Sequence, residues 1–122
     1  MSANILTVDD SASIRMTTKI ALTNAGYKVT EAVDGVDGLN KAKSASFDLI
    51  VTDLNMPNMN GLAMIEALRQ SPAHTGIPII FLTTESDADM KSRAKAAGAT
   101  GWITKPFDPE QLVKIARKVL GK

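Results

Sequence analysis

The chain has 122 residues and a mass of 13.0 kDa, which allows one folded domain with a substantial core but leaves no room for a second. Its net charge of +1 and hydrophobic content of 44% are ordinary for a globular protein, and the lack of cysteine excludes disulfides, thiol catalysis and cysteine metal sites. No apolar stretch is long enough for a membrane span and the N-terminus does not resemble a secretory signal, so we expect a cytoplasmic protein.

Charge is unevenly divided along the chain. Residues 1–85 carry 6 Lys and Arg against 9 Asp and Glu, whereas residues 86–122 carry 8 against 4. This mild excess is more typical of solvated helices than of nucleic-acid binding, which needs a strongly basic patch. We therefore expect no nucleic-acid partner, and a basic docking face for an acidic protein partner stays open.

Short apolar runs alternate with helical patterns from one end of the chain to the other. The strands are expected at about residues 5–8, 28–32, 49–52, 79–82 and 101–104, the second being an outer strand because it alternates only weakly. The helices are expected at about residues 13–25, 36–44, 62–70 and 86–97, and from 109 onward. With short connections and right-handed crossovers, this order predicts an α/β fold with a doubly wound parallel sheet.

Several residues mark the predicted helix ends. Gly26 and Gly98 follow the first and fourth helices as stops, and Asp34-Gly35 is expected to form a turn. Ser86-x-x-Asp89 has the spacing of a capping box, and Asp108-Pro109 supplies an N-cap followed by proline. Apolar positions are expected in the first helix at Ile14, Ile20 and Leu22, and as a core stripe in the last at Leu112, Ile115, Ala116, Val119 and Leu120.

Polar residues follow four of the predicted strands directly. They are Asp9-Asp10, Asp53, Thr83 and Lys105. Because ligands of open parallel sheets bind at the carboxyl ends of the strands, these side chains are expected to share one edge. Three carboxylates, a hydroxyl and an ammonium group at one edge predict a phosphate and metal site.

The three predicted neighbours Asp9, Asp10 and Asp53 would repel one another at neutral pH unless a counter-charge is present. Mg²⁺ prefers oxygen ligands and is held by one or two carboxylates together with a phosphate. A carboxylate can also accept a phosphoryl group, and Lys105 and Thr83 could offset charge on its oxygens. Taken singly, each of these residues would be an ordinary cap, strand or surface residue.

Further short motifs occur in a fixed order with these residues. They are Val8-Asp9-Asp10-Ser11 with Ile14-Arg15, Asp53-Leu54-Asn55-Met56-Pro57, Gly61, Thr83, Gly98-Ala99 and Lys105-Pro106-Phe107. Over essentially its whole length the chain resembles the receiver domains of two-component response regulators, in particular the stand-alone CheY type. The resemblance implies a (βα)5 flavodoxin-like sheet with strand order 2-1-3-4-5, and we expect residues 1–122 to form a single receiver domain with no output domain.

The resemblance also implies a role for each residue at the strand ends. Asp53 would accept a phosphoryl group from a phosphohistidine of a sensor kinase. Asp10 and Asp53 would bind Mg²⁺ through their carboxylates, Asn55 through its backbone carbonyl and Asp9 through water. Lys105 would contact the phosphoryl group.

Switching is expected to involve Thr83 and Trp102. Thr83 would move toward the phosphoryl oxygen and, with the aromatic residue of the last strand, change the surface of the last two helices and the strand between them. The aromatic position holds Trp102, where Tyr or Phe is more usual in the family; indole is larger than phenol and its N–H needs a partner when buried. Simple packing or docking is therefore the alternative role of Trp102. The Lys105–Pro106 peptide bond is expected to be cis.

The phosphorylated state is expected to last seconds to minutes. In receivers similar to this chain, polar residues at the positions of Asn55 and Glu85 accompany fast hydrolysis, and both side chains can hydrogen bond to water. Thr84, where a smaller residue is common, would slow hydrolysis by crowding. We expect self-phosphorylation and self-dephosphorylation only, and no enzyme activity on other substrates.

The expected function is a phosphorylation-activated signalling switch in chemotaxis. Its partners would be a CheA-like histidine kinase and a flagellar motor switch protein or a phosphatase, and we expect a monomer that binds no membrane. A phosphate sink or relay regulator that shares a kinase stays open. The enzyme alternative, a phosphatase with an Asp nucleophile, would need an acid where Asn55 stands and a cap insertion. A non-phosphorylated interaction module conflicts with intact Asp53 and Lys105.

Overall fold

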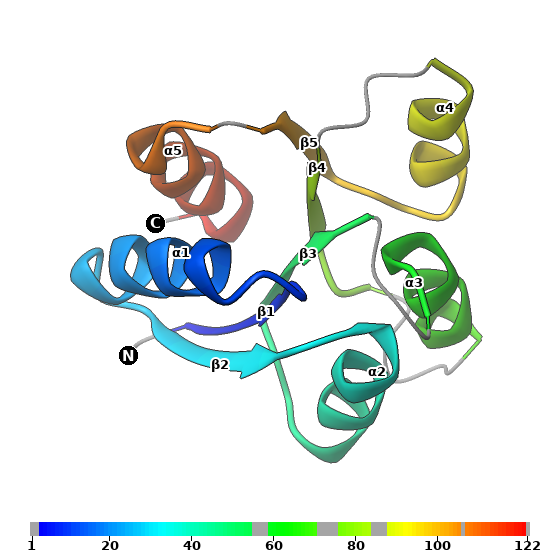
Figure 1. Cartoon of the computed structure of the whole chain (residues 1–122), viewed down its shortest axis with the longest axis horizontal. Coiled ribbons are helices and arrows are strands. Elements are labelled where there is room, and N and C mark those ends of the chain that lie inside the picture. Colours follow the sequence, from blue (N-terminus) through cyan, green and yellow to red (C-terminus); the bar gives the residue numbers. More distant parts are fainter. Residues whose placement is uncertain (1–2, 55–58, 71–75, 84–87, 106, 122) are drawn as a thin grey trace.

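Figure 1 presents the computed structural model of the chain, which describes residues 3–54, 59–70, 76–83, 88–105 and 107–121. The elements are β1 (Asn4–Val8), α1 (Ala12–Asn24), β2 (Lys28–Ala32), α2 (Gly35–Ser44), β3 (Leu49–Asp53), α3 (Gly61–Arg69), β4 (Ile79–Thr83), α4 (Ala88–Ala96), β5 (Gly101–Thr104) and α5 (Pro109–Leu120). All strand pairs are parallel, in the order β2-β1-β3-β4-β5. The predicted fold and strand order are confirmed.

The sheet separates two hydrophobic clusters. Helices α1 and α5 cover one face, and α2, α3 and α4 cover the other (Figure 1). Since successive side chains of a strand point to opposite faces, each inner strand contributes to both clusters. Ile80 and Leu82 of β4 lie in the cluster with α1 and α5, whereas Ile79 and Phe81 lie in the cluster with α2, α3 and α4.

Burial of the strands follows their place in the sheet. Every residue of β3 and β4 is buried, which explains why these strands have nearly continuous apolar sequences. Strand β2 alternates between exposed and partly buried residues until Ala32, as expected for an outer strand. The residues that end β3 and β4 therefore lie in the best-packed part of the molecule.

Capping side chains set the starts of the helices. Ser11 accepts a hydrogen bond from the Ile14 N–H, and Asn60 accepts one from the Ala63 N–H at 2.8 Å. Asp34 caps α2 in the same way, so that the helix begins at Gly35 itself rather than after the predicted turn. The predicted cap at Asp108 is confirmed, whereas Ser86 lies outside the described residues.

The apolar positions of the outer helices are buried to different degrees. Leu112 and Ala116 of α5 are fully buried, as predicted, and the remaining apolar residues of that helix pack against the same cluster. In α1, Leu22 is buried, but Ile20 is 53% exposed and faces solvent. Among the described residues, no helix combines the length and apolar character needed to cross a membrane.

Arg69, the last residue of α3, ties three segments together. Its Nη2 donates to the carbonyl of Ile77 at 2.8 Å and to that of Gly98 at 3.0 Å, and its Nε donates to the carbonyl of Ala97 at 3.3 Å. Ala97 and Gly98 follow directly after α4, where helix carbonyls lack partners within the helix. One guanidinium group thus joins the ends of α3 and α4 to the segment before β4.

Candidate functional site

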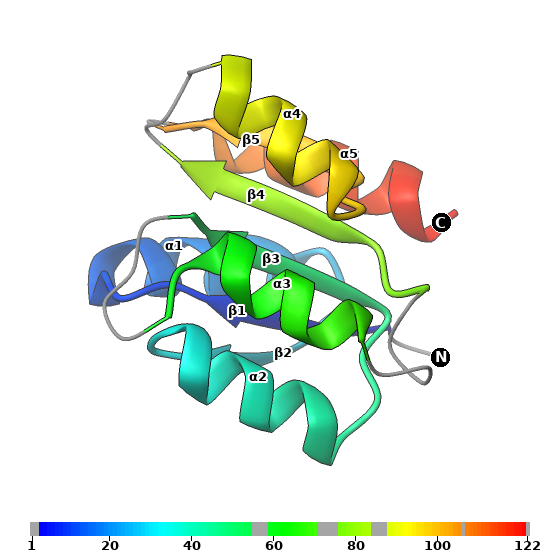
Figure 2. The ribbon, with the colours of Figure 1, turned by 90° about the vertical axis from the view of Figure 1, so that its right-hand side faces the viewer.

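Four neighbouring strands bring the predicted site residues to one edge of the sheet. Asp53 and Thr83 are the last residues of β3 and β4, and Asp9 and Lys105 come directly after β1 and β5. The strands run in the same direction, so their carboxyl ends lie along a common edge (Figure 2). The edge lies beside the point where the chain reverses its order between β1 and β3, which is where open parallel sheets bind ligands.

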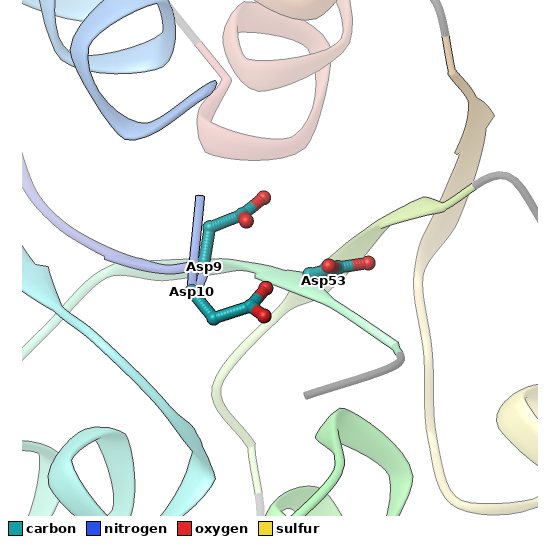
Figure 3. Close-up of side chains that lie close together, drawn as sticks. All are labelled: Asp9, Asp10 and Asp53. Carbon is teal, nitrogen blue, oxygen red and sulfur yellow. The ribbon is translucent and has the colours of Figure 1, made fainter. Parts of the chain in front are cut away.

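Three carboxylates form the acidic part of this edge. Asp9, Asp10 and Asp53 each offer an oxygen atom, and these atoms all lie within 4.8 Å of one another (Figure 3). Asp9 and Asp53 are buried and Asp10 is exposed. A group of carboxylate oxygens with one exposed member fits a hard cation such as Mg²⁺, which prefers oxygen ligands and keeps bound waters.

Lys105 links two of the carboxylates. Its Nζ lies 3.0 Å from Oδ2 of Asp9 and 3.4 Å from Oδ2 of Asp53. All three side chains are largely buried, so water screens their charges only weakly. The ammonium group therefore offsets part of the repulsion between Asp9 and Asp53, and it lies beside the carboxylate predicted to accept the phosphoryl group.

The backbone fixes the orientation of the Asp53 carboxylate. Its Oδ1 accepts a hydrogen bond from the Leu54 N–H at 2.8 Å, which leaves Oδ2 facing Lys105. Burial raises the pKa of this carboxyl above its ordinary value; the Lys105 charge lowers the pKa, Asp9 raises it, and the Leu54 hydrogen bond lowers it. The pKa is raised on balance, which indicates that burial outweighs the neighbouring cation.

A close backbone approach explains Gly61, which the sequence presented only as part of a motif. A Cβ atom at this position would lie 2.2 Å from the backbone oxygen of Asp53. The Gly61 N–H also donates to the carbonyl of Leu54 at 2.8 Å. The start of α3 is therefore packed against the end of β3, and only glycine fits there.

Thr83 and Trp102 lie on the part of the sheet nearest α4. Thr83 is fully buried, and its carbonyl accepts a hydrogen bond from the Lys105 N–H at 2.7 Å. Trp102 is partly buried, with its ring centroid 5.9 Å from that of Phe81 and 5.6 Å from Lys91 Nζ. The Trp102 Nε1 atom is buried and has no hydrogen-bond partner among the residues described here. The indole ring thus packs against the core, but its buried N–H makes no hydrogen bond with the described residues.

The contact that Arg15 makes with this site could not be predicted from the sequence. Arg15 entered the motif only as a neighbour of Ile14, yet its Nη1 donates to the backbone oxygen of Asp9 at 2.7 Å. No local pattern identifies such a contact, because it joins a helix side chain to a backbone atom outside that helix. Predictions about Asn55, Thr84, Glu85 and the Lys105–Pro106 bond concern residues outside the described part of the chain, and they stay predictions.

Comparison with known proteins identifies the family. Residues 5–117 match the response regulator receiver domain, and the chain belongs to this family. Receiver domains accept phosphoryl groups from histidine kinases and bind Mg²⁺ at an acidic pocket. The chain is therefore a receiver domain of two-component signalling, and the cluster of Asp9, Asp10 and Asp53 gives it an acidic pocket of the kind at which this class binds Mg²⁺.

Individual relatives agree with this assignment. The chemotaxis protein CheY4 of Vibrio cholerae is 45% identical, with a TM-score of 0.93 over 98% of this chain and 99% of that protein. The receiver domain of the sensor histidine kinase PA1611 from Pseudomonas aeruginosa, solved with magnesium in its active-site cleft, is 25% identical, with a TM-score of 0.91 and full coverage of both chains. Response regulator ArlR of Staphylococcus aureus is 39% identical over 116 residues, 95% of this chain; the chain spans about half the length (52%) of this curated relative.

Proposed function

We propose that this receiver domain is a phosphorylation-activated switch in which Asp53 accepts a phosphoryl group from a phosphohistidine of a histidine kinase. The observation that carries the proposal is the position of Asp53 between an ammonium group 3.4 Å away and two further carboxylates. In the transfer, the phosphorus–nitrogen bond of the donor breaks and a bond to an oxygen of Asp53 forms. Later attack by water returns the carboxylate and releases inorganic phosphate.

Each residue of the site contributes to the transfer by position and charge. Asp53 is held by the Leu54 N–H, so one orientation of its carboxylate is preset before the donor arrives. Lys105 carries a compact positive charge on a flexible side chain, so its ammonium group can stay in contact with a phosphoryl oxygen during the transfer. Asp9, Asp10 and Asp53 would hold Mg²⁺. When bound there, the ion would offset negative charge on the transferred group.

Chemotaxis is the pathway that we propose, since 45% identity to a chemotaxis protein supports it. The output surface would be α4, β5 and α5. A hollow of about 260 Å³ beside Trp102 supports this choice, because Lys91 and Lys95 of α4 line it and would attract an acidic partner. The partners would be a CheA-like kinase and a flagellar motor switch protein; a phosphate sink or relay regulator is the second candidate.

Labelling with radioactive acetyl phosphate tests the phosphoacceptor. We expect the wild-type chain to be labelled in the presence of Mg²⁺ and not in EDTA, and Asp53→Asn to remain unlabelled. Asp48→Asn is the matched control, because Asp48 is an exposed carboxylate that precedes β3 at the opposite end of the strand. Full labelling of Asp53→Asn would refute the assignment.

We further propose that the domain turns over no substrate beyond its own phosphate. Hydrolysis of small phosphate esters separates this proposal from a phosphatase with an Asp nucleophile. The expected result is no multiple turnover of an ester such as p-nitrophenyl phosphate under conditions that label Asp53. Sustained turnover that is lost in Asp53→Asn would favour the phosphatase.

A further inference from the structure

Arg15 connects the acidic edge to the outer strand of the sheet. It lies near the start of α1, and its side chain is only 17% exposed. Nη1 donates to the backbone oxygen of Asp9 at 2.7 Å, and Nε lies 3.8 Å from Oε1 of Glu31 in β2. The guanidinium group therefore bridges the Glu31 carboxylate and the backbone oxygen of Asp9.

That oxygen belongs to the peptide unit that joins Asp9 to Asp10. Because a peptide unit is planar, a hydrogen bond to its oxygen fixes the direction in which the next residue leaves. The Asp9 N–H is also held, by the carbonyl of Ala32 at 3.1 Å, and the Asp9 carboxylate accepts from the Ser11 N–H at 2.9 Å. Arg15 therefore holds the peptide unit that precedes Asp10, and the Ser11 N–H holds the one that follows it.

Of the three carboxylates, that of Asp10 is the least constrained by contacts of its own. Its side chain is exposed, and its carboxylate takes part in none of the hydrogen bonds or ion pairs found among the described residues. Asp9 and Asp53, in contrast, both contact Lys105. The position of the Asp10 carboxylate within 4.8 Å of the other two therefore depends on the backbone that leads to it.

We propose that Arg15 is a positioning residue for the cation site: it holds the Asp9–Asp10 peptide so that the Asp10 carboxylate faces the other two, and Glu31 holds the guanidinium group in place. The inference rests on the proposed Mg²⁺ site. Groups that orient metal ligands without touching the metal change its affinity when they are removed, by about 10- to 100-fold. Arg15 fits this description, since it contacts the backbone of one ligand and no carboxylate of the site.

The charge of Arg15 and its positioning contact predict opposite effects of its removal on the affinity for Mg²⁺. A positive side chain close to the site repels a cation, so its removal would strengthen Mg²⁺ binding if charge alone mattered. Loss of a positioning contact would weaken binding instead. The direction of the change in Mg²⁺ affinity therefore separates the two effects.

The test compares Arg15→Met with Lys19→Met by calorimetric titration with Mg²⁺. Lys19 lies 3.5 Å from the same Glu31 and carries the same charge, but its side chain is half exposed and, among the described residues, does not contact Asp9. We expect Arg15→Met to bind Mg²⁺ about ten-fold more weakly and Lys19→Met to bind as the wild type does. Arg15→Lys keeps the charge but replaces the planar fork of N–H donors by a single ammonium group, so it should fall between Arg15→Met and the wild type.

A second measurement distinguishes positioning from general damage. With acetyl phosphate as donor, the Mg²⁺ concentration for half-maximal phosphorylation of Arg15→Met should rise about ten-fold, while the rate at saturating Mg²⁺ stays near that of the wild type. Wild-type or tighter Mg²⁺ binding by folded Arg15→Met would overturn the proposal, and wild-type binding by Arg15→Lys would do so if the Met variant does not fold. Failure of the wild-type chain to bind Mg²⁺ would instead refute the proposed cation site itself.

Discussion

Lys105 and Asp53 form an ion pair across the edge of the sheet, with Nζ 3.4 Å from Oδ2 and both side chains nearly nine-tenths buried. Lys105 directly follows β5 and Asp53 ends β3, and β4 lies between these two strands, so the pair exists only when the sheet is complete. The same ammonium group contacts Asp9 at 3.0 Å. A phosphoryl group on Asp53 would therefore meet a cation that the fold already holds in position.

We expect Lys105→Arg to lose the signalling output although it keeps the positive charge. The guanidinium group is planar and larger than an ammonium group, and the space between Asp9 and Asp53 is defined by contacts of 3.0 and 3.4 Å. The measurement is binding of an acidic partner, such as a motor switch protein, before and after phosphorylation. Lys43→Arg, on the exposed surface of α2, is the control and should behave as the wild type does. Normal activation of Lys105→Arg would remove Lys105 from the proposed mechanism.

The raised pKa of Asp53 predicts a pH dependence of stability. In the native state, Asp53 holds its proton to higher pH than the ordinary Asp value of 3.8, so the free energy of unfolding falls as the pH rises from 3.8 through the native pKa. In EDTA at neutral pH, Asp53→Asn should therefore be more stable than the wild type.

Urea unfolding at neutral pH and at about pH 3 measures this effect, since free Asp is largely protonated at the lower pH. The advantage of Asp53→Asn should shrink as the pH falls through the native pKa to 3.8, and below 3.8 the wild-type carboxyl becomes protonated in both states. Asp48→Asn, which changes an exposed carboxylate, serves as the control. A wild-type chain that is more stable than Asp53→Asn at neutral pH in EDTA would contradict the raised pKa.

Trp102 is the only tryptophan of the chain and reports on switching. If Thr83 moves toward the phosphoryl group, packing around the Phe81–Trp102 pair should change, because Phe81 lies two residues before Thr83 on the same face of β4. Addition of Mg²⁺ and beryllofluoride, a phosphoryl mimic, should then alter Trp102 emission, and Thr83→Ala should reduce that change. An equal response in Thr83→Ala would refute the coupling between the two residues.

Arg69→Met should lower the free energy of unfolding by about 1–3 kcal/mol, because the partly buried carbonyls of Ile77 and Ala97 would lose their donor. Urea unfolding measures the effect. Arg117→Met provides the comparison, since Arg117 is exposed on α5 and its loss should change stability little. Equal stability of the two variants would show that water replaces the Arg69 contacts without cost.

The sheet and its edge could be predicted because both depend on local patterns. Apolar runs predicted the buried strands, and the polar residue after each run predicted the side chains that gather at one edge, including Asp53 and Lys105. The strand order came from the family resemblance, since alternating strands and helices are compatible with more than one order.

Contacts between distant backbone and side-chain atoms could not be predicted in this way. Arg15 and Arg69 both donate to carbonyls outside their own helices, and any surface arginine has the same local pattern. Ile20 was expected among the apolar positions of α1, but hydrophobicity alone does not show which side of a helix faces water. The reason for glycine at position 61 also became visible only in the structure, since the backbone oxygen of Asp53 is the atom that excludes a side chain there.

The division of the core into two clusters makes the sheet a partition between two compartments. Phe81 and Trp102 belong to the compartment of α4, and the two-residue repeat of a strand assigns Thr83 to the same side as Phe81. Leu82 and Ile103 belong to the compartment of α1 and α5. A rearrangement that starts at the Thr83 side chain is therefore transmitted first by side-chain packing on one side. The rearrangement reaches the side chains of the opposite compartment only through the backbone of β4 and β5. The packing of α1 and α5 can therefore stay unchanged while the side chains next to α4 repack.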